Sequence, residues 1–133
     1  MKTSLGIWAF GAMATRFNPG GYKPDLAGAS TVSKVRTAVE GLGDLIDDYE
    51  FHYPQELSPD NLEDVRQALD GHGIYCVATG LHLDPIFGRG GLVNPDPRVR
   101  AEATRIAVAG AELAGKLVDG HRISWRLVRR TRA

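Results

Sequence analysis

Aromatic, imidazole and hydroxyl side chains stand at the ends of three short segments of this chain that have the pattern of β-strands. In chain order they are Trp8 and Phe10, then His52 and Tyr53, then Thr79 and His82. Aromatic faces pack against the C–H face of a sugar, and imidazole and hydroxyl groups hydrogen bond to its oxygens. The mixture suits a polyhydroxylated ligand if the three ends lie together. The alternative is that the aromatics are core residues and that the histidines are structural polar groups.

The three segments are predicted to be strands of a parallel sheet. They read SLGIWAFG at 4–11, YEFHY at 49–53 and GIYCVATG at 73–80. A helical pattern follows each of them, with starts expected at Ser30 or Thr31, at Ser58 or Asp60, and after NPDP at 94–97. Strict alternation of strand and helix indicates an α/β fold with the strand ends on one edge of the sheet. The residues alone leave open whether this is half of a barrel or a doubly wound sheet.

Composition limits the class of protein. A chain of 133 residues with 43% hydrophobic and 24% charged side chains fits one globular domain. It has no apolar run of about 20 residues, so we expect a soluble cytoplasmic protein without a membrane partner. Cys76 is the single cysteine, which excludes a cysteine-based zinc site. Asp47 and Asp48 are interpreted as a solvated turn, and FGRGG at 87–91 as a flexible loop that lacks the phosphate-loop pattern.

Several motifs together resemble the N-terminal part of the xylose isomerase-like family of (β/α)8 barrels. They are GIWAFG, TRFNPGG, EFHYP and ATGLHLDPIFGRGGLVNPDPRVR, and the resemblance covers about residues 5–117. It implies a partial (β/α)8 TIM barrel of about three βα units, within a domain at 1–117. It also implies metal-dependent interconversion of an aldose and a ketose, with magnesium, manganese or cobalt as the family cofactor.

The resemblance implies roles for five residues. His52 would be catalytic at ring opening, and Trp8, Phe17, Thr79 and His82 would contact the substrate, although His82 stands where the family carries an aromatic residue. In the family, acidic residues close behind the histidine hold its imidazole. Here Tyr53, Pro54 and Gln55 come before Glu56, so the resemblance does not carry that pair over.

The family's metal carboxylates and catalytic lysine lie on later strands that this sequence does not contain, so we expect no metal site and no cofactor in this chain. The resemblance stops near residue 117. Residues 121–133 hold five arginines and no acid, a charge of +5, whereas the other 120 residues carry −5. We interpret 118–133 as a non-native tail of a truncated or frameshifted product. A genuine small protein whose tail has its own role is the alternative.

Two classes of function follow. The first is a sugar isomerase chain that binds a monosaccharide, is homo-oligomeric in its full-length family and is inactive alone; a related epimerase is also open. The second is a non-catalytic fragment or binding module that pairs with another chain. We do not expect nucleic acid as a partner.

Overall fold

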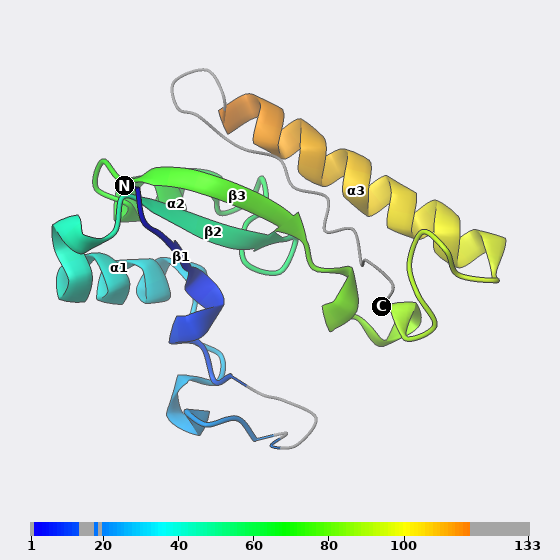
Figure 1. Cartoon of the computed structure of the whole chain (residues 1–133), viewed down its shortest axis with the longest axis horizontal. Helices are drawn as coiled ribbons and strands as arrows, with labels where there is room; N and C mark the ends of the chain where they lie inside the picture. Colours follow the sequence, from blue (N-terminus) through cyan, green and yellow to red (C-terminus); the bar gives the residue numbers. More distant parts are fainter. Residues whose placement is uncertain (1, 14–17, 19, 118–133) are drawn as a thin grey trace.

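The structure is a computed structural model that describes residues 2–13, 18 and 20–117 (Figure 1). Strands and α-helices alternate along these residues. In chain order they are β1 (Ser4–Gly6), α1 (Thr31–Leu42), β2 (Asp48–Tyr53), α2 (Leu62–Ala68), β3 (Gly73–Thr79) and α3 (Pro97–Leu117). The strands form one sheet in the order β1-β2-β3, and both neighbouring pairs are parallel. The predicted α/β class and parallel sheet are confirmed, and residues 118–133 lie outside the description.

The first strand is shorter than predicted. Residues 4–6 pair with β2, but Ile7–Phe10 forms a 3-10 helix, η1, that leaves the sheet. The turn closes when the Gly11 N–H donates to the Trp8 carbonyl at 3.0 Å. Gly6 makes this bend possible, because a Cβ at that position would overlap the indole of Trp8. The indole therefore folds back over the end of β1.

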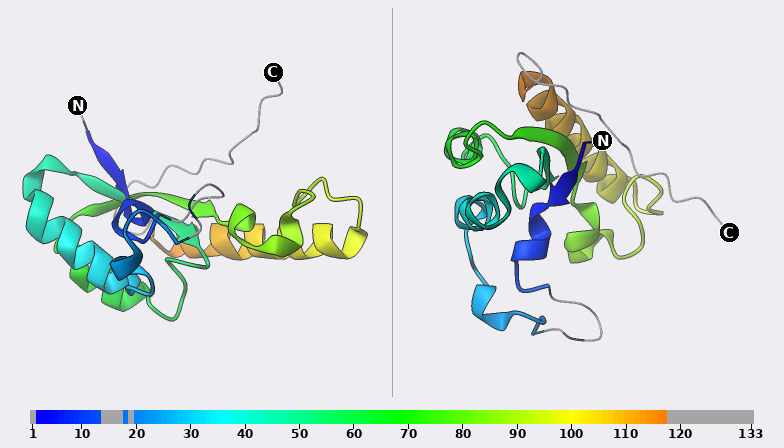
Figure 2. Two further views of the ribbon diagram at one scale, coloured as in Figure 1. Left: turned by 90° about the horizontal axis from the view of Figure 1, so that it is seen from below. Right: turned by 60° about the vertical axis from the view of Figure 1, so that its left-hand side comes forward.

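The core lies on one face of the sheet. Register places Tyr49 and Phe51 of β2 beside Ile74 and Val77 of β3, and all four are buried. They pack with residues from all three α-helices, namely Val35, Ala38, Val65, Ala68, Leu113, Ala114 and Leu117. Figure 2 shows α1 and α2 side by side on this face. Burying each large apolar side chain contributes about 1.5–3 kcal/mol.

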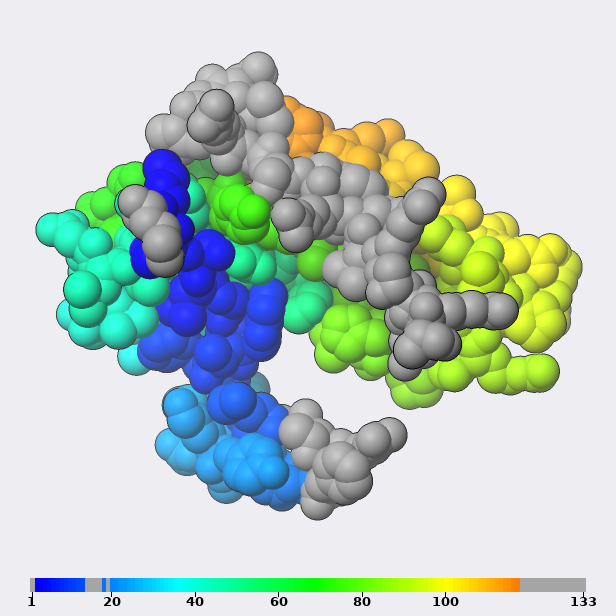
Figure 3. Space-filling view, in the orientation of Figure 1, coloured from blue at the N-terminus to red at the C-terminus, as the bar shows by residue number. Residues whose placement is uncertain are grey.

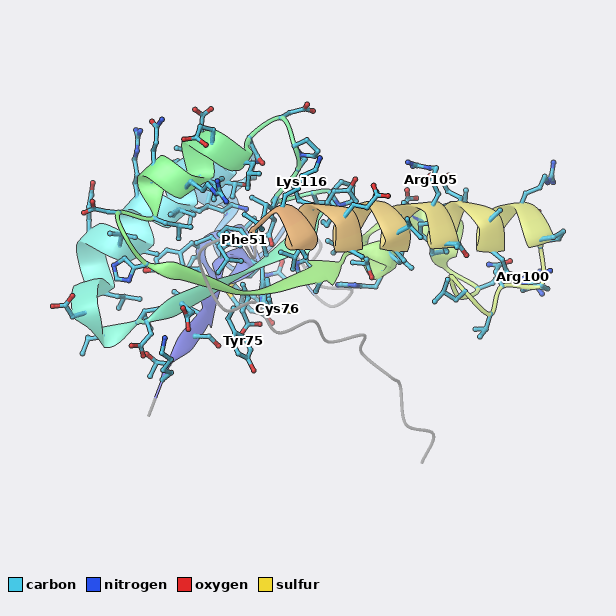
Figure 4. All side chains as sticks on the ribbon, turned by 90° about the horizontal axis from the view of Figure 1, so that it is seen from above. Phe51, Tyr75, Cys76, Arg100, Arg105 and Lys116 are labelled. Carbon is cyan, nitrogen blue, oxygen red and sulfur yellow. The ribbon has the colours of Figure 1, made fainter. Side chains whose placement is uncertain are left out.

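The opposite face of the sheet carries smaller and more polar residues. Because side chains alternate along a strand, Glu50 and His52 point away from the side on which Phe51 lies. The Ser4 hydroxyl donates to Glu50 at 2.6 Å across β1 and β2. Figure 4 shows Tyr75 and Cys76 on this side of β3, away from the helices. His52 thus lies at the C-terminal end of β2, on the face without the core.

Helix α3 approaches the sheet closely at one glycine. A Cβ at Gly110 would lie 3.3 Å from Cδ1 of Tyr53 and 3.5 Å from Cγ2 of Thr79. Gly110 weakens a helix, yet it is buried against both strands, which gives the packing reason for its position. None of the helices in the described ranges is long and apolar enough to cross a membrane.

Candidate functional site

An open cleft of about 710 Å³ lies at the C-terminal edge of the sheet. Its wall includes Trp8, Lys34, His52, Gln55, Glu56 and His82. In the space-filling view the surface is hollowed between the N-terminal segment and the green loop that follows β3 (Figure 3). The loops that follow parallel strands meet at this edge, which is where α/β proteins place their binding sites.

His52 stands between two other rings. Its centroid lies 4.4 Å from that of Trp8, with the planes tilted by 44°. On its other side, the ring of His82 lies 5.2 Å away in an edge-on arrangement. His82 belongs to η4 (Leu81–Leu83), directly after β3. Trp8 is 41% exposed, so part of the indole remains open to a ligand.

Glu56 holds the His52 imidazole, although three residues separate it from His52. The chain turns after β2, where the N–H groups of Glu56 and Leu57 donate to the His52 carbonyl at 2.8 and 3.1 Å. Asn61 fixes this turn, because its Nδ2 donates to the Glu56 carbonyl at 2.9 Å. Glu56 Oε2 accepts from the His52 backbone N–H at 2.9 Å and lies 3.1 Å from Nδ1 of its ring. The acid–imidazole pair, which the resemblance did not carry over, is therefore present.

This pairing determines which ring nitrogen carries the proton. An ionised carboxylate only accepts hydrogen bonds, so contact with such a carboxylate favours the neutral tautomer of His52 with its hydrogen on Nδ1. Nε2 then keeps its lone pair and can take a proton from a ligand in the cleft. Glu56 is 7% exposed, and burial protects the hydrogen bond from competition by water.

Lys34 is a cleft residue that sequence reasoning missed. It comes from α1, and its side chain is only 16% exposed. It passes Gly11, where a Cβ would lie 3.3 Å from Nζ. Its Nζ lies 3.9 Å from Oε1 of Glu56. Nothing in the sequence marks Lys34, because the helix was identified by its apolar residues alone.

One predicted substrate residue, Thr79, is not brought to the cleft. The side chain of Thr79 lies against Gly110 of α3, on the face opposite His52, because Thr79 pairs with Tyr53 rather than with His52. Phe17 falls outside the described residues. Trp8, His52 and His82 do gather there.

The donor set does not fit a metal centre. Over residues 2–13, 18 and 20–117, no group of three or more His, Cys, Asp or Glu side chains is placed to hold an ion. The magnesium, manganese or cobalt implied by the resemblance has no matching ligands in this part of the chain, and we derive no chemical step through a metal.

The comparisons with known proteins give no family. No protein-family model matches the chain, and no curated protein matches it significantly. The resemblance to xylose isomerase-like enzymes therefore stays a prediction from the residues.

Proposed function

We propose that this chain binds a monosaccharide in the cleft and that His52 opens the sugar ring. The observation that carries the proposal is the His52–Glu56 hydrogen bond at 3.1 Å, formed beside the partly exposed face of Trp8. An aromatic face with a general base next to it is a combination that serves cyclic sugars, which have one apolar face and acidic anomeric hydroxyls.

Ring opening needs one proton removed and one supplied. Nε2 of His52 takes the proton of the anomeric hydroxyl, and the oxygen's electron pair forms the C1 carbonyl. The bond between C1 and the ring oxygen breaks, and the ring oxygen takes up a proton from solvent in the open cleft. Glu56 stabilises the imidazolium that forms, and an imidazole exchanges protons readily near neutral pH.

The resemblance places this step in a longer reaction. We propose that residues 1–117 are a partial (β/α)8 barrel of the xylose isomerase-like type, whose full-length members are homo-oligomers. The subsequent aldose–ketose interconversion relies on metal ligands from strands beyond those described. The isolated chain should therefore not isomerise an aldose, even with added magnesium, manganese or cobalt. A sugar epimerase would use the same ring-opening step.

A non-catalytic binding module that pairs with another chain is the second candidate. Within the part of the chain that the structure describes, β1 and β3 each hydrogen bond to β2 alone. Unpaired strand edges favour addition of a strand from another chain. A stable complex with another chain and no acceleration of ring opening would favour this candidate.

Sugar binding is tested by saturation-transfer NMR with D-xylose and the full chain. We expect transfer to the C–H protons of the sugar, and we expect Trp8→Ala to abolish it. Tyr22→Ala is the matched control, because Tyr22 is an aromatic residue that is 68% exposed and does not line the cleft. Equal signals from Trp8→Ala and wild type, or no signal with D-xylose, would contradict binding in this cleft.

A further inference from the structure

Lys34 and Glu56 face each other across a gap in the wall of the cleft. The distance of 3.9 Å between Nζ and Oε1 is too long for a hydrogen bond. Both groups are shielded: the Lys34 side chain is 16% exposed, and the Glu56 side chain, taken without its backbone, is 9% exposed. Neither Nζ nor Oε1 is a fully buried atom without a partner, so both atoms remain accessible from the cleft.

The hydrogen bonds of the two groups can be counted. Glu56 uses Oε2 for both the backbone and the ring of His52. Among the described residues, no hydrogen bond reaches Oε1, and none joins the Lys34 ammonium to an acceptor. Shielded charged groups are costly unless they are hydrogen bonded. Both groups line the cleft, so a molecule bound there can hydrogen bond to Nζ of Lys34 and to Oε1 of Glu56.

The geometry selects one kind of chemical group. An atom about 2.8 Å from Nζ and about 2.8 Å from Oε1 fits between two atoms that are 3.9 Å apart. A hydroxyl accepts from Lys34 and donates to Glu56 at the same time. A carboxylate or phosphate has no proton for Glu56 and is repelled by it, and an ammonium group is repelled by Lys34.

We propose that Lys34 and Glu56 form a hydroxyl clamp, which binds one hydroxyl of the ligand and selects neutral sugars over acidic ones. The clamp rests on the proposed function, because it acts on a sugar in the same cleft. Glu56 then has two roles through two oxygens: Oε2 holds His52, and Oε1 orients the substrate beside it.

Affinity measurements on the full chain test the clamp. NMR titrations would compare D-xylose, D-xylonate and the singly deoxygenated analogues of D-xylose. We expect wild type to bind D-xylonate at least about tenfold more weakly than D-xylose. We also expect its affinity for one deoxy analogue to be about tenfold lower than for D-xylose. Lys34→Met should weaken the binding of D-xylose by a similar factor. It should not further weaken the binding of that deoxy analogue, since the shared hydrogen bond is already lost.

The controls separate the clamp from general effects of charge and folding. Lys116→Met removes an exposed lysine of α3 and should leave every affinity unchanged. Lys34→Arg keeps a donor and should retain part of the affinity. The clamp is wrong if the binding free energy lost in Lys34→Met and that lost with each deoxy analogue are fully additive. It is also wrong if wild type binds D-xylonate as tightly as D-xylose. In both cases sugar binding stands. No binding of any of these sugars to wild type overturns the proposed function and the clamp together.

Discussion

Nδ1 of His52 lies 3.1 Å from Oε2 of Glu56, the residue four positions further along the chain. The same oxygen accepts the backbone N–H of His52 at 2.9 Å, so one carboxylate oxygen fixes both the ring and the strand end that carries it. This double contact holds the imidazole against Trp8 and engages Nδ1 rather than Nε2. It is the feature on which the proposed chemistry depends.

Replacing Glu56 should change the tautomer of His52. In wild type at pH 8 we expect the neutral ring to carry its hydrogen on Nδ1, because Glu56 accepts there. Glu56→Ala removes the acceptor, so the population with hydrogen on Nε2 should rise. Long-range ¹H–¹⁵N NMR of the ring nitrogens measures this. Glu50→Ala, on the same face of β2, is the control. An unchanged tautomer in Glu56→Ala would show that Glu56 does not set it.

Gly6 should control the position of Trp8. A Cβ at residue 6 would overlap the indole, so Gly6→Ala should push the ring away from His52. We expect tryptophan emission to shift to longer wavelength as the indole becomes more exposed, and D-xylose binding to weaken. The spectrum is read in a Trp125→Phe background, which leaves Trp8 as the one tryptophan. Gly41→Ala, which would meet nothing within 4 Å, should not change emission. An identical spectrum for Gly6→Ala would refute the packing.

Two glycines of α3 should respond differently to alanine. Gly115→Ala meets no atom within 4 Å and should stabilise the fold by about 0.5–1 kcal/mol through helix propensity. At Gly110 the new Cβ would press on Tyr53 at 3.3 Å, so the same gain should be cancelled or reversed. Urea unfolding measures both changes. Equal stabilisation at the two positions would mean that α3 does not pack closely at Gly110.

The Asp47 carboxylate should show a pH response set by Thr3. The Thr3 N–H donates to Oδ2 at 2.7 Å and the Thr3 hydroxyl lies 3.1 Å from the same atom. These hydrogen bonds, the backbone one first, lower the pKa of Asp47 below 3.8. A lowered pKa stabilises the fold above pH 3.8, and the contribution is lost as pH falls through the folded-state pKa.

Thr3→Val removes the hydroxyl and keeps the backbone donor. The pKa of Asp47 should therefore move part of the way back toward 3.8, as followed by NMR of the carboxyl carbon. The Thr3–Asp47 contact should make wild type more stable to unfolding than the variant. This difference in unfolding free energy should shrink as the pH drops below 3.8. Thr37→Val is the control, since its hydroxyl bonds to the Ser33 carbonyl. A pKa of Asp47 that does not move would contradict the contact.

Sequence periodicity predicted the sheet well but not its first strand. Residues 49–53 alternate aromatic and polar side chains, and residues 73–80 form an apolar run; the observed parallel strands β2 and β3 match these segments closely. Residues 4–11 carry a similar run, yet pairing stops at Gly6. Trp8 contacts His52, which is 44 positions away in the sequence, so the local pattern could not reveal the bend.

The cleft was predicted in part for a related reason. Trp8, His52 and His82 follow from the rule that parallel strand ends meet at one edge. Glu56 returns to His52 through a turn closed by backbone hydrogen bonds and by Asn61, which spacing alone does not show. Thr79 stands at the correct strand end, but strand alternation turns its side chain to the helix side. The face of the sheet on which a side chain lies depends on strand register. The sequence specifies register only through the apolar residues that must be buried in the core.

The rate of exchange between the two anomers of D-xylose tests the account most directly. NMR exchange spectroscopy would follow the anomeric protons with wild type, His52→Gln and the control His72→Gln, whose partly buried ring lies 2.9 Å from the Ile46 carbonyl at the other end of the sheet. We expect wild type and His72→Gln to accelerate exchange, and His52→Gln to reduce the acceleration by at least about 100-fold, the usual contribution of a general base. Two results would contradict the claim that His52 opens the sugar ring. Wild type would accelerate exchange no more than buffer, or His52→Gln would accelerate it as much as wild type.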